Sequence, residues 1–126
     1  MPYAIKHIPD LKTIEVTLTG VITGVDLKRA TTDAISLQRQ TGVTRLLIDA
    51  DGWEVAASPL EIFDLPARQY WEEGAKRETR FAVIRPTSSS AREAARTYET
   101  MCQNRGWRAR IWPDRESAMG WLTDAV

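Results

Sequence analysis

Two carboxylates near the middle of the chain are the first side chains that could do chemistry. Asp49 and Asp51 are separated by one residue and followed by Gly52. Paired carboxylates can bind a divalent cation or serve as an acid and a base. Aspartates beside a glycine also form ordinary turns, and no third oxygen-rich cluster accompanies this pair. We therefore predict no metal site and keep both aspartates as candidate contacts with a partner or ligand.

Nucleophilic catalysis would have to use His7, which is the only histidine of the chain. A serine or cysteine nucleophile needs a base beside it and a third group that orients the base. The two candidate nucleophiles, Ser58 and Cys102, are far from His7 in sequence. Cys102 also occupies an apolar position of an expected helix, where a thiol is usually inert. We predict a protein that is not an enzyme and that uses no cofactor.

Ser58 stands where a helix should begin. It is followed by Pro59, and Glu61 lies three positions after it, which is the spacing of a capping box. As a helix cap alone, the serine contributes about 1 kcal/mol, and we favour this role. A phosphate on Ser58 would gain backbone N–H bonds and a favourable helix dipole, so Ser58 is also a candidate phosphosite.

Four aromatic residues lie in and after this segment: Trp53, Phe63, Tyr70 and Trp71. Large rigid rings are favoured in pockets and at interfaces. Core packing accounts for Phe63 and for one of Tyr70 and Trp71. Trp53, in an expected surface loop between a glycine and a glutamate, is the hardest to place in a core. We expect Trp53 to be exposed and to contact the partner or ligand.

The charges balance, which excludes a global field that would attract nucleic acid. Lysine plus arginine and aspartate plus glutamate number 17 each. A local basic group surrounds the last expected strand and consists of Arg105, Arg108, Arg110 and Arg115. It could bind a phosphate or an acidic partner. Arginine on an edge strand also blocks unwanted strand pairing, and we favour that role.

The sequence also indicates the cellular compartment of the protein. Apolar stretches run only a few residues, far below the roughly 20 that span a bilayer, so we expect no membrane span. The first residues, MPYAIKHIPD, lack the apolar region of a signal peptide. One cysteine cannot form an internal disulfide, which agrees with reducing surroundings. We expect a cytoplasmic protein.

Alternating strands and helices must position these residues. Alternating apolar residues or short apolar runs predict strands over residues 3–8, 13–19, 45–48, 79–85 and 108–112. Apolar residues three and four apart, together with caps, predict helices over residues 26–41, 59–64, 66–76, 90–105 and 114–125. Residues 21–24 should form a bend and residues 49–57 a surface loop. Pro66 should break the second helical region, because it lacks an N–H and clashes with the preceding turn.

This order predicts an α/β sandwich of two or three layers with a mainly parallel five-stranded sheet. The first strand should be antiparallel, because only a short break separates it from the second. A length of 126 residues fits a single domain, 1–126. In such sheets ligands and partners dock at the carboxyl ends of the strands, which places the expected site between residues 49 and 63.

Three segments resemble the STAS-like family, the sulfate-transporter and anti-sigma-factor-antagonist fold. Residues 14–20 (IEVTLTG) resemble its second strand and following glycine, residues 45–49 (RLLID) its central strand, and residues 116–122 (ESAMGWL) the last helix of its lipid-binding-like branch. The element order matches over essentially the whole chain. The resemblance implies the order β-β-α-β-α-β-α-β-α and a non-enzymatic module that binds a protein or a small apolar ligand.

In family members that antagonise anti-sigma factors, a kinase phosphorylates a serine at the start of the second helix. Counted from Asp49, Ser58 falls at that position. The aspartate that precedes the serine in the family is Ala57 here, and Pro59-Leu60 replaces the next two residues of the motif. The resemblance therefore carries the position of the phosphosite but not its motif.

Two functions remain open at this stage. The first is a regulatory module that contacts a protein partner through residues 49–63, with Tyr70 and Trp71 beside them. The alternative is a carrier of a small apolar or lipid-like ligand, in which the break at Pro66 opens a dry cavity of roughly a few hundred Å³. A homodimer is left open as well.

Overall fold

Five strands form one sheet, and their order in space is their order along the chain. They are β1 (Tyr3–Ile8), β2 (Thr13–Thr23), β3 (Arg45–Ala56), β4 (Arg80–Ile84) and β5 (Arg108–Trp112). β1 runs antiparallel to β2, and all other neighbours are parallel. The computed structural model describes residues 2–124. The predicted α/β fold with a mainly parallel sheet and an antiparallel first strand is confirmed.

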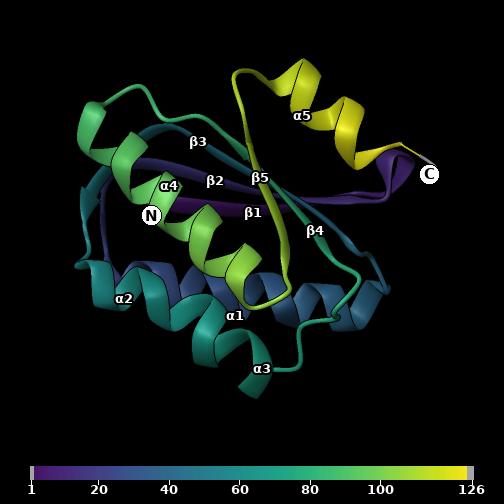
Figure 1. Cartoon of the computed structure of the whole chain (residues 1–126). Coiled ribbons are helices and arrows are strands. Elements are labelled where there is room, and N and C mark those ends of the chain that lie inside the picture. The colour runs from purple at the N-terminus through teal and green to yellow at the C-terminus, as the bar shows by residue number, and fades with distance from the viewer. Residues whose placement is uncertain (1, 125–126) are drawn as a thin grey trace.

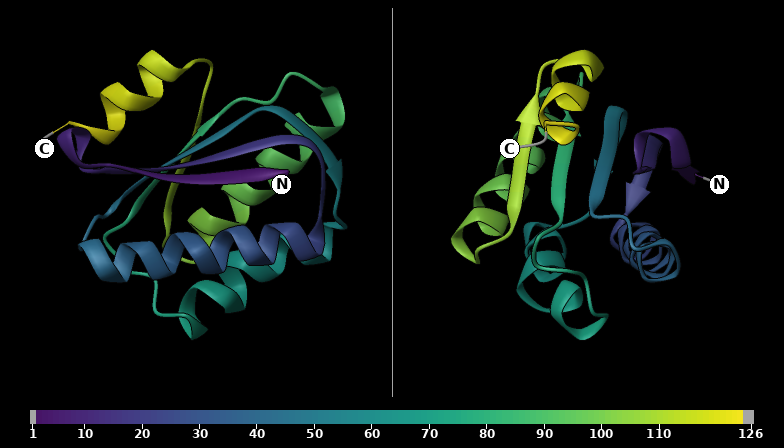
Figure 2. Two further views of the ribbon diagram at one scale, coloured as in Figure 1. Left: turned by 180° about the vertical axis from the view of Figure 1, so that it is seen from behind. Right: turned by 90° about the vertical axis from the view of Figure 1, so that its right-hand side faces the viewer.

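Helices cover the two faces of the sheet unequally. The helical elements are the 3₁₀ turn η1 (Pro9–Leu11), α1 (Gly24–Thr41), α2 (Pro59–Asp64), the π-helical segment η2 (Leu65–Gln69), α3 (Tyr70–Glu72), α4 (Ser89–Asn104) and α5 (Arg115–Leu122). One face of the sheet carries α1, α2, η2, α3 and α4, and the other carries α5 (Figure 1; Figure 2). No helix within residues 2–124 is long and apolar enough to cross a membrane.

The central strand β3 is covered on both faces, as its apolar run predicts. Leu46 is 5% exposed and belongs to the larger core, which lies between the sheet and α1, α2 and α4. Leu47, its neighbour, is fully buried on the opposite face, where a smaller core includes Ala118 and Leu122 of α5. The alternation of a strand thus sends consecutive leucines into different cores.

β2 and β3 are longer than predicted. The expected bend at residues 21–24 and the expected loop at residues 49–57 are wrong, because Gly20 to Thr23 pair with Trp53 to Ala56 in parallel register. The register shifts between Thr17 and Thr19, as at a β-bulge. Polar residues and a glycine hide this extension from pattern analysis, since strand pairing between distant segments overrides local propensity.

Pro66 does not break the second helical region, which is a second correction. α2, η2 and α3 follow one another without interruption from Pro59 to Glu72. The wider turn of η2, in which the Tyr70 N–H donates to the Leu65 carbonyl, accommodates the proline. The helical path ends at Glu72, short of the predicted residue 76.

Replacing Leu47 with alanine tests the double coverage of β3. Because Leu47 is fully buried, we expect Leu47→Ala to lower the free energy of unfolding by about 2–5 kcal/mol. Leu60→Ala is the matched control, since Leu60 is 78% exposed and its truncation should change stability by no more than about 0.5 kcal/mol. Urea denaturation measures both. Equal losses for the two variants would contradict the two-core arrangement.

Candidate functional site

Trp53 lies in the core, and the expectation that it is exposed is wrong. The side chain is 6% exposed and belongs to the larger core. The register shift next to it changes the alternation of β3, so Ala50 and Trp53 both join the larger core although three positions separate them. Trp53 is therefore not a surface contact for a partner in this conformation.

Tyr70 is also a core residue. It is 4% exposed, its ring stacks on Phe81 with centroids 5.0 Å apart, and its hydroxyl lies 2.5 Å from that of Tyr98. Burial raises the pKa of both hydroxyls well above the ordinary value. Cys102, on the same helix as Tyr98, is fully buried, and burial raises the pKa of its thiol to about 12. A thiol with such a pKa is not a nucleophile at neutral pH.

The Asp51 backbone N–H donates to the Asp49 carboxylate at 3.2 Å, but the two carboxylates have different side-chain partners. Asp49 pairs with Arg115 at 3.5 Å, and Arg115 also donates to Glu15 at 2.7 Å. This hydrogen bond lowers the pKa of the Glu15 carboxyl. Asp51 accepts a hydrogen bond from the hydroxyl of Thr87 at 2.8 Å. Within residues 2–124, no three histidine, cysteine, aspartate or glutamate side chains are grouped so that they could hold a metal ion.

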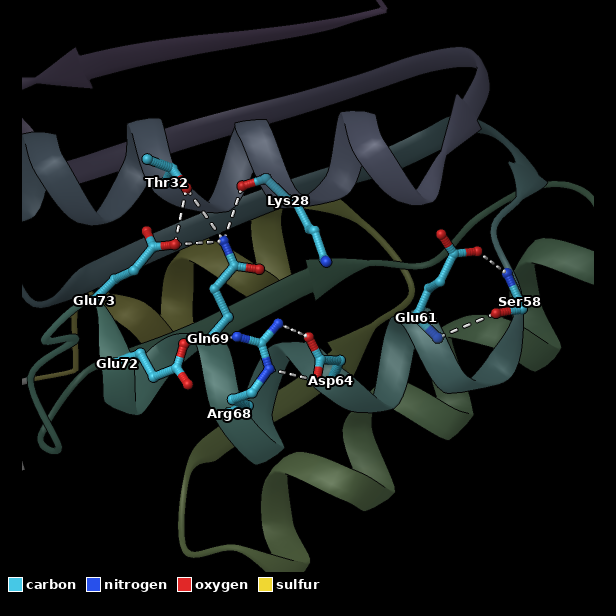
Figure 3. A network of polar contacts seen from close by, with 9 residues as sticks. All are labelled: Lys28, Thr32, Ser58, Glu61, Asp64, Arg68, Gln69, Glu72 and Glu73. Atoms are coloured by element: carbon cyan, nitrogen blue, oxygen red, sulfur yellow. Dashed lines mark hydrogen bonds and ion pairs between the residues drawn. The ribbon is translucent and has the colours of Figure 1, made fainter.

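Ser58 caps α2 in the way that its spacing predicts. Its Oγ accepts from the Glu61 backbone N–H at 3.2 Å, and the Glu61 carboxylate accepts from the Ser58 N–H at 2.9 Å (Figure 3). The same carboxylate lies against Gly24 at the start of α1, where a Cβ atom would collide with it. The N-termini of α1 and α2 therefore meet at one carboxylate, which both helix dipoles favour.

A polar network joins α1 to the continuous helical segment formed by α2, η2 and α3, which we call the second helical unit. The Gln69 side-chain amide lies 2.9 Å from the Lys28 carbonyl and 2.9 Å from the Glu73 carboxylate (Figure 3). On the outer side, Arg68 pairs with Asp64 and Glu72, each four residues away. The hydrogen bond from Arg68 lowers the pKa of the Asp64 carboxyl. Sequence reasoning missed this network, although the i to i+4 spacing of its charges was a usable signal.

Two aromatic residues and two arginines at and near α2 and α3 are linked by ring contacts. We define the outer α2–α3 surface as these four residues, Phe63, Trp71, Arg77 and Arg105, together with Leu60, which precedes Phe63 by three positions on α2. Leu60 is 78% exposed and Trp71 56% exposed, whereas Phe63 is half-buried. Both arginines are exposed residues. This surface contains two of the predicted site residues, Phe63 and Trp71.

Each arginine of this surface stacks on an aromatic ring. The guanidinium carbon of Arg77 lies 4.5 Å from the ring centre of Trp71 and 4.1 Å from that of the buried Trp107. That of Arg105 lies 4.7 Å from the ring centre of Phe63. The Arg77 guanidinium also donates to the Arg105 carbonyl at 3.0 Å. Sequence reasoning grouped Arg105 with the basic residues near β5 and missed Arg77, because no local spacing links either arginine to its ring.

Two solved structures illustrate what this chain is similar to. One is an uncharacterised protein of the DUF3478 family with a SpoIIAA-like fold from Shewanella loihica PV-4, at 18% identity and a TM-score of 0.58, covering 95% of this chain and 91% of that one. The other is the unphosphorylated anti-sigma factor antagonist SpoIIAA, at 12% identity and a TM-score of 0.59, covering 98% and 99%. The chain has the SpoIIAA-like fold. No protein-family model and no curated protein matches it.

In this SpoIIAA-like domain the predicted site residues separate into two groups. Those at or near the surface are Asp49, Asp51, Ser58, Phe63 and Trp71. Those in the core are Trp53 and Tyr70. The fold agrees with the STAS-like resemblance, and the start of α2 follows the carboxyl end of β3.

A double-mutant cycle tests the contact between the two helix starts of the SpoIIAA-like domain. Gly24→Ala should cost no more than about 1 kcal/mol, because the new methyl group displaces the flexible end of Glu61 and with it the hydrogen bond from the Ser58 N–H. Glu61→Ala should cost about 1 kcal/mol as a lost cap. The double variant should be about as stable as either single variant, since both changes remove the same hydrogen bond. Thermal denaturation of the four proteins measures the coupling, and strictly additive losses would contradict the contact.

Proposed function

We propose that this chain is a non-enzymatic regulatory module of the STAS-like type that binds a protein partner through the start of α2 and the outer α2–α3 surface. The observation that carries the proposal is the exposure of Leu60 and Trp71, at 78% and 56%, on one helical unit. Tryptophan is among the residues that dominate binding energy at protein interfaces. Exposed apolar side chains gathered on one element mark contact sites more than isolated ones do.

The fold supports a regulatory role by likeness. One of the two similar structures is named an anti-sigma factor antagonist. Fold alone does not carry function from one protein to another, so the role is part of the proposal. We place the module in the cytoplasm, where its single cysteine stays reduced.

Ser58 remains a candidate phosphosite within this proposal, with a physical obstacle. Ser58 is exposed, so its hydroxyl is within reach of a kinase. The Glu61 carboxylate already occupies the N-terminal anion position beside Ser58, at 2.9 Å from the Ser58 backbone nitrogen. A phosphate there would meet like charge and displace the carboxylate. The helix cap is therefore the better-supported role.

The arginines of the outer α2–α3 surface indicate which chemical groups the partner would present. The guanidinium carbons of Arg77 and Arg105 lie over aromatic rings, and each guanidinium has five N–H donors, of which Arg77 gives one to the Arg105 carbonyl, so donors remain for a partner. A partner that supplies apolar side chains flanked by carboxylates would complement this surface. Such electrostatic complementarity sets specificity and association rate more than affinity.

The carrier of a lipid-like ligand receives less support. The larger core has a cavity of about 70 Å³, well below the roughly 300 Å³ at which drug-sized ligand pockets begin. Partner binding needs no cavity of that size and is the better-supported function.

Truncation of the outer surface tests the proposal. The Leu60→Ala/Trp71→Ala variant should bind the partner at least roughly 30-fold more weakly, the effect of a hot spot worth about 2 kcal/mol. The matched control is Leu11→Ala, which truncates a leucine that is 42% exposed in the turn after β1. Quantitative affinity purification from the native source, with isothermal titration of the enriched protein, measures binding. A partner that binds the double variant and the control equally well would exclude this surface.

A further inference from the structure

The two edges of the sheet differ in whether their outward backbone groups have partners. At the β5 edge, the Ile111 N–H donates to the Glu99 carboxylate at 2.7 Å. The Ala109 carbonyl accepts from the Gln103 side-chain amide at 3.0 Å, so two side chains of α4 cover this edge. Unpaired groups on an edge strand can pair with another chain, and cover of this kind prevents it. The β1 edge has no such cover within residues 2–124.

Backbone groups of β1 point alternately to β2 and away from the sheet. The Thr19 N–H donates to the Pro2 carbonyl at 2.9 Å, and the antiparallel register continues from there, so the even-numbered residues turn to β2. Tyr3, Ile5 and His7 therefore turn their N–H and C=O groups outward. None of these outward groups is hydrogen-bonded within residues 2–124. They form a free row of one donor and one acceptor per residue.

An open groove of about 430 Å³ accompanies this edge. We call it the β1–α1 groove, and its walls are Tyr3 and Ile5 of β1 and Asp33, Ser36, Leu37 and Gln40 of α1. β1 and α1 run in the same direction, with β1 as the outermost strand (Figure 2). Two residues of a strand rise roughly 6.6 Å and one helical turn roughly 5.4 Å, so successive outward residues of β1 meet successive turns of α1.

The groove combines a negative charge with an apolar centre. Asp33 accepts a hydrogen bond from the Tyr3 hydroxyl at 3.0 Å and forms no ion pair within residues 2–124. This includes Arg29, which lies one turn earlier on α1. Ile5 and Leu37 are half-buried, so part of each side chain remains accessible from the groove. The groove is thus complementary to an apolar side chain next to a positive charge.

A second copy of the chain fits this edge less well than a single extended segment. α1 packs against both β1 and β2, so it lies close to the edge itself. Pairing of β1 with the β1 of another copy would bring the two α1 helices toward each other through exposed polar side chains, among them Ser36 and Gln40. Burial of such groups costs free energy unless each finds a new partner. A single strand brings no helix of its own.

We propose that the β1–α1 groove binds an extended peptide segment of a partner protein, which adds to β1 as an antiparallel strand. The backbone of the segment pairs with the outward groups of Tyr3, Ile5 and His7, and every second side chain enters the groove. An apolar side chain contacts Ile5 and Leu37, and a lysine or arginine pairs with Asp33. The groove shares no residue with the outer α2–α3 surface, and the inference does not rest on the proposed function.

The probe is the peptide acetyl-Thr-Lys-Thr-Ile-Thr-Lys-Thr-amide, whose two lysines and isoleucine lie on one face of a strand. With the isoleucine opposite Ile5, a lysine lies beside Asp33. Amide hydrogen exchange of the full chain, followed by NMR during a peptide titration, measures binding. Exchange of the Tyr3, Ile5 and His7 N–H groups should slow in a saturable way, whereas that of the even-numbered residues, which already face β2, should change little.

Two N-methylated peptides test the backbone pairing. In an antiparallel pair, the N–H of the residue opposite Ile5 points to β1 and those of its neighbours point away. N-methylation of the isoleucine should therefore abolish binding. N-methylation of the threonine before it is the matched control and should leave binding unchanged.

Variants of the chain test the groove itself. His7→Pro removes an outward N–H at an edge position where proline is tolerated and should weaken binding roughly two- to tenfold, whereas His7→Ala keeps the N–H and should not. Asp33→Asn should weaken binding by up to roughly fivefold, as expected for an exposed ion pair. Ser36→Trp fills the groove from an exposed position and should abolish binding, which keeps the test decisive if His7→Pro does not fold.

Three results would overturn the proposal. The first is the absence of saturable protection of the outward β1 amides. The second is equal binding of the unmodified peptide and the peptide that is N-methylated at isoleucine, because the segment would then not pair as an antiparallel strand. The third is protection of the same amides that rises with protein concentration when no peptide is present, because a second copy of the chain would then occupy the edge.

Discussion

The burial of β3 on both faces is the constraint on which the other elements depend. A strand whose side chains are apolar on both sides needs a cover above and below it, and the parallel sheet supplies one through its crossovers. The order β1-β2-β3-β4-β5 moves in one direction across the sheet. Right-handed crossovers in one direction place every connecting helix on the same face. The other face would be bare without α5, whose Ala118 and Leu122 cover Leu47 and Ala82. A helix of eight residues thus completes the burial of the central strand.

The π-helical turn that contains Pro66 determines which side chains of the second helical unit face the core. A regular α-helix could not contain this proline without losing a hydrogen bond and gaining a clash. The π-helical segment adds length to one turn and so rotates everything that follows it. Tyr70 consequently enters the core beside Phe81, and Gln69 reaches α1, whereas Trp71 lies outside. The contrast between a buried Tyr70 and an exposed Trp71 is a product of this turn.

Features that the sequence encodes locally could be predicted, and features made by distant pairing could not. The cap formed by Ser58 and Glu61 follows from a spacing of three residues, and the central strand follows from a run of apolar residues. The extension of β3 depends on a bulged register with β2, about thirty residues away in sequence, which no local pattern contains. The expectation that Trp53 is exposed is wrong for that reason. The stacking of Arg77 on Trp107 joins the loop after α3 to the residue before β5, so only Phe63 and Trp71 of the outer α2–α3 surface could be predicted from the sequence.

The stacked arginines bear on whether the outer surface exists for a partner or only for the fold. Arg77 covers part of Trp71 and contacts the buried Trp107, so it helps to hold the end of α3 against the core. That structural role explains the contact of Arg77 with Trp107, because Trp107 is 2% exposed and its ring is part of the core. It does not account for Trp71, which stays 56% exposed although the arginine is already in place, or for Leu60, which is 78% exposed. A cation over an exposed ring contributes about 0.5–1 kcal/mol, less than the burial of a large apolar side chain at an interface would add. The remaining exposed area is what a partner would bury.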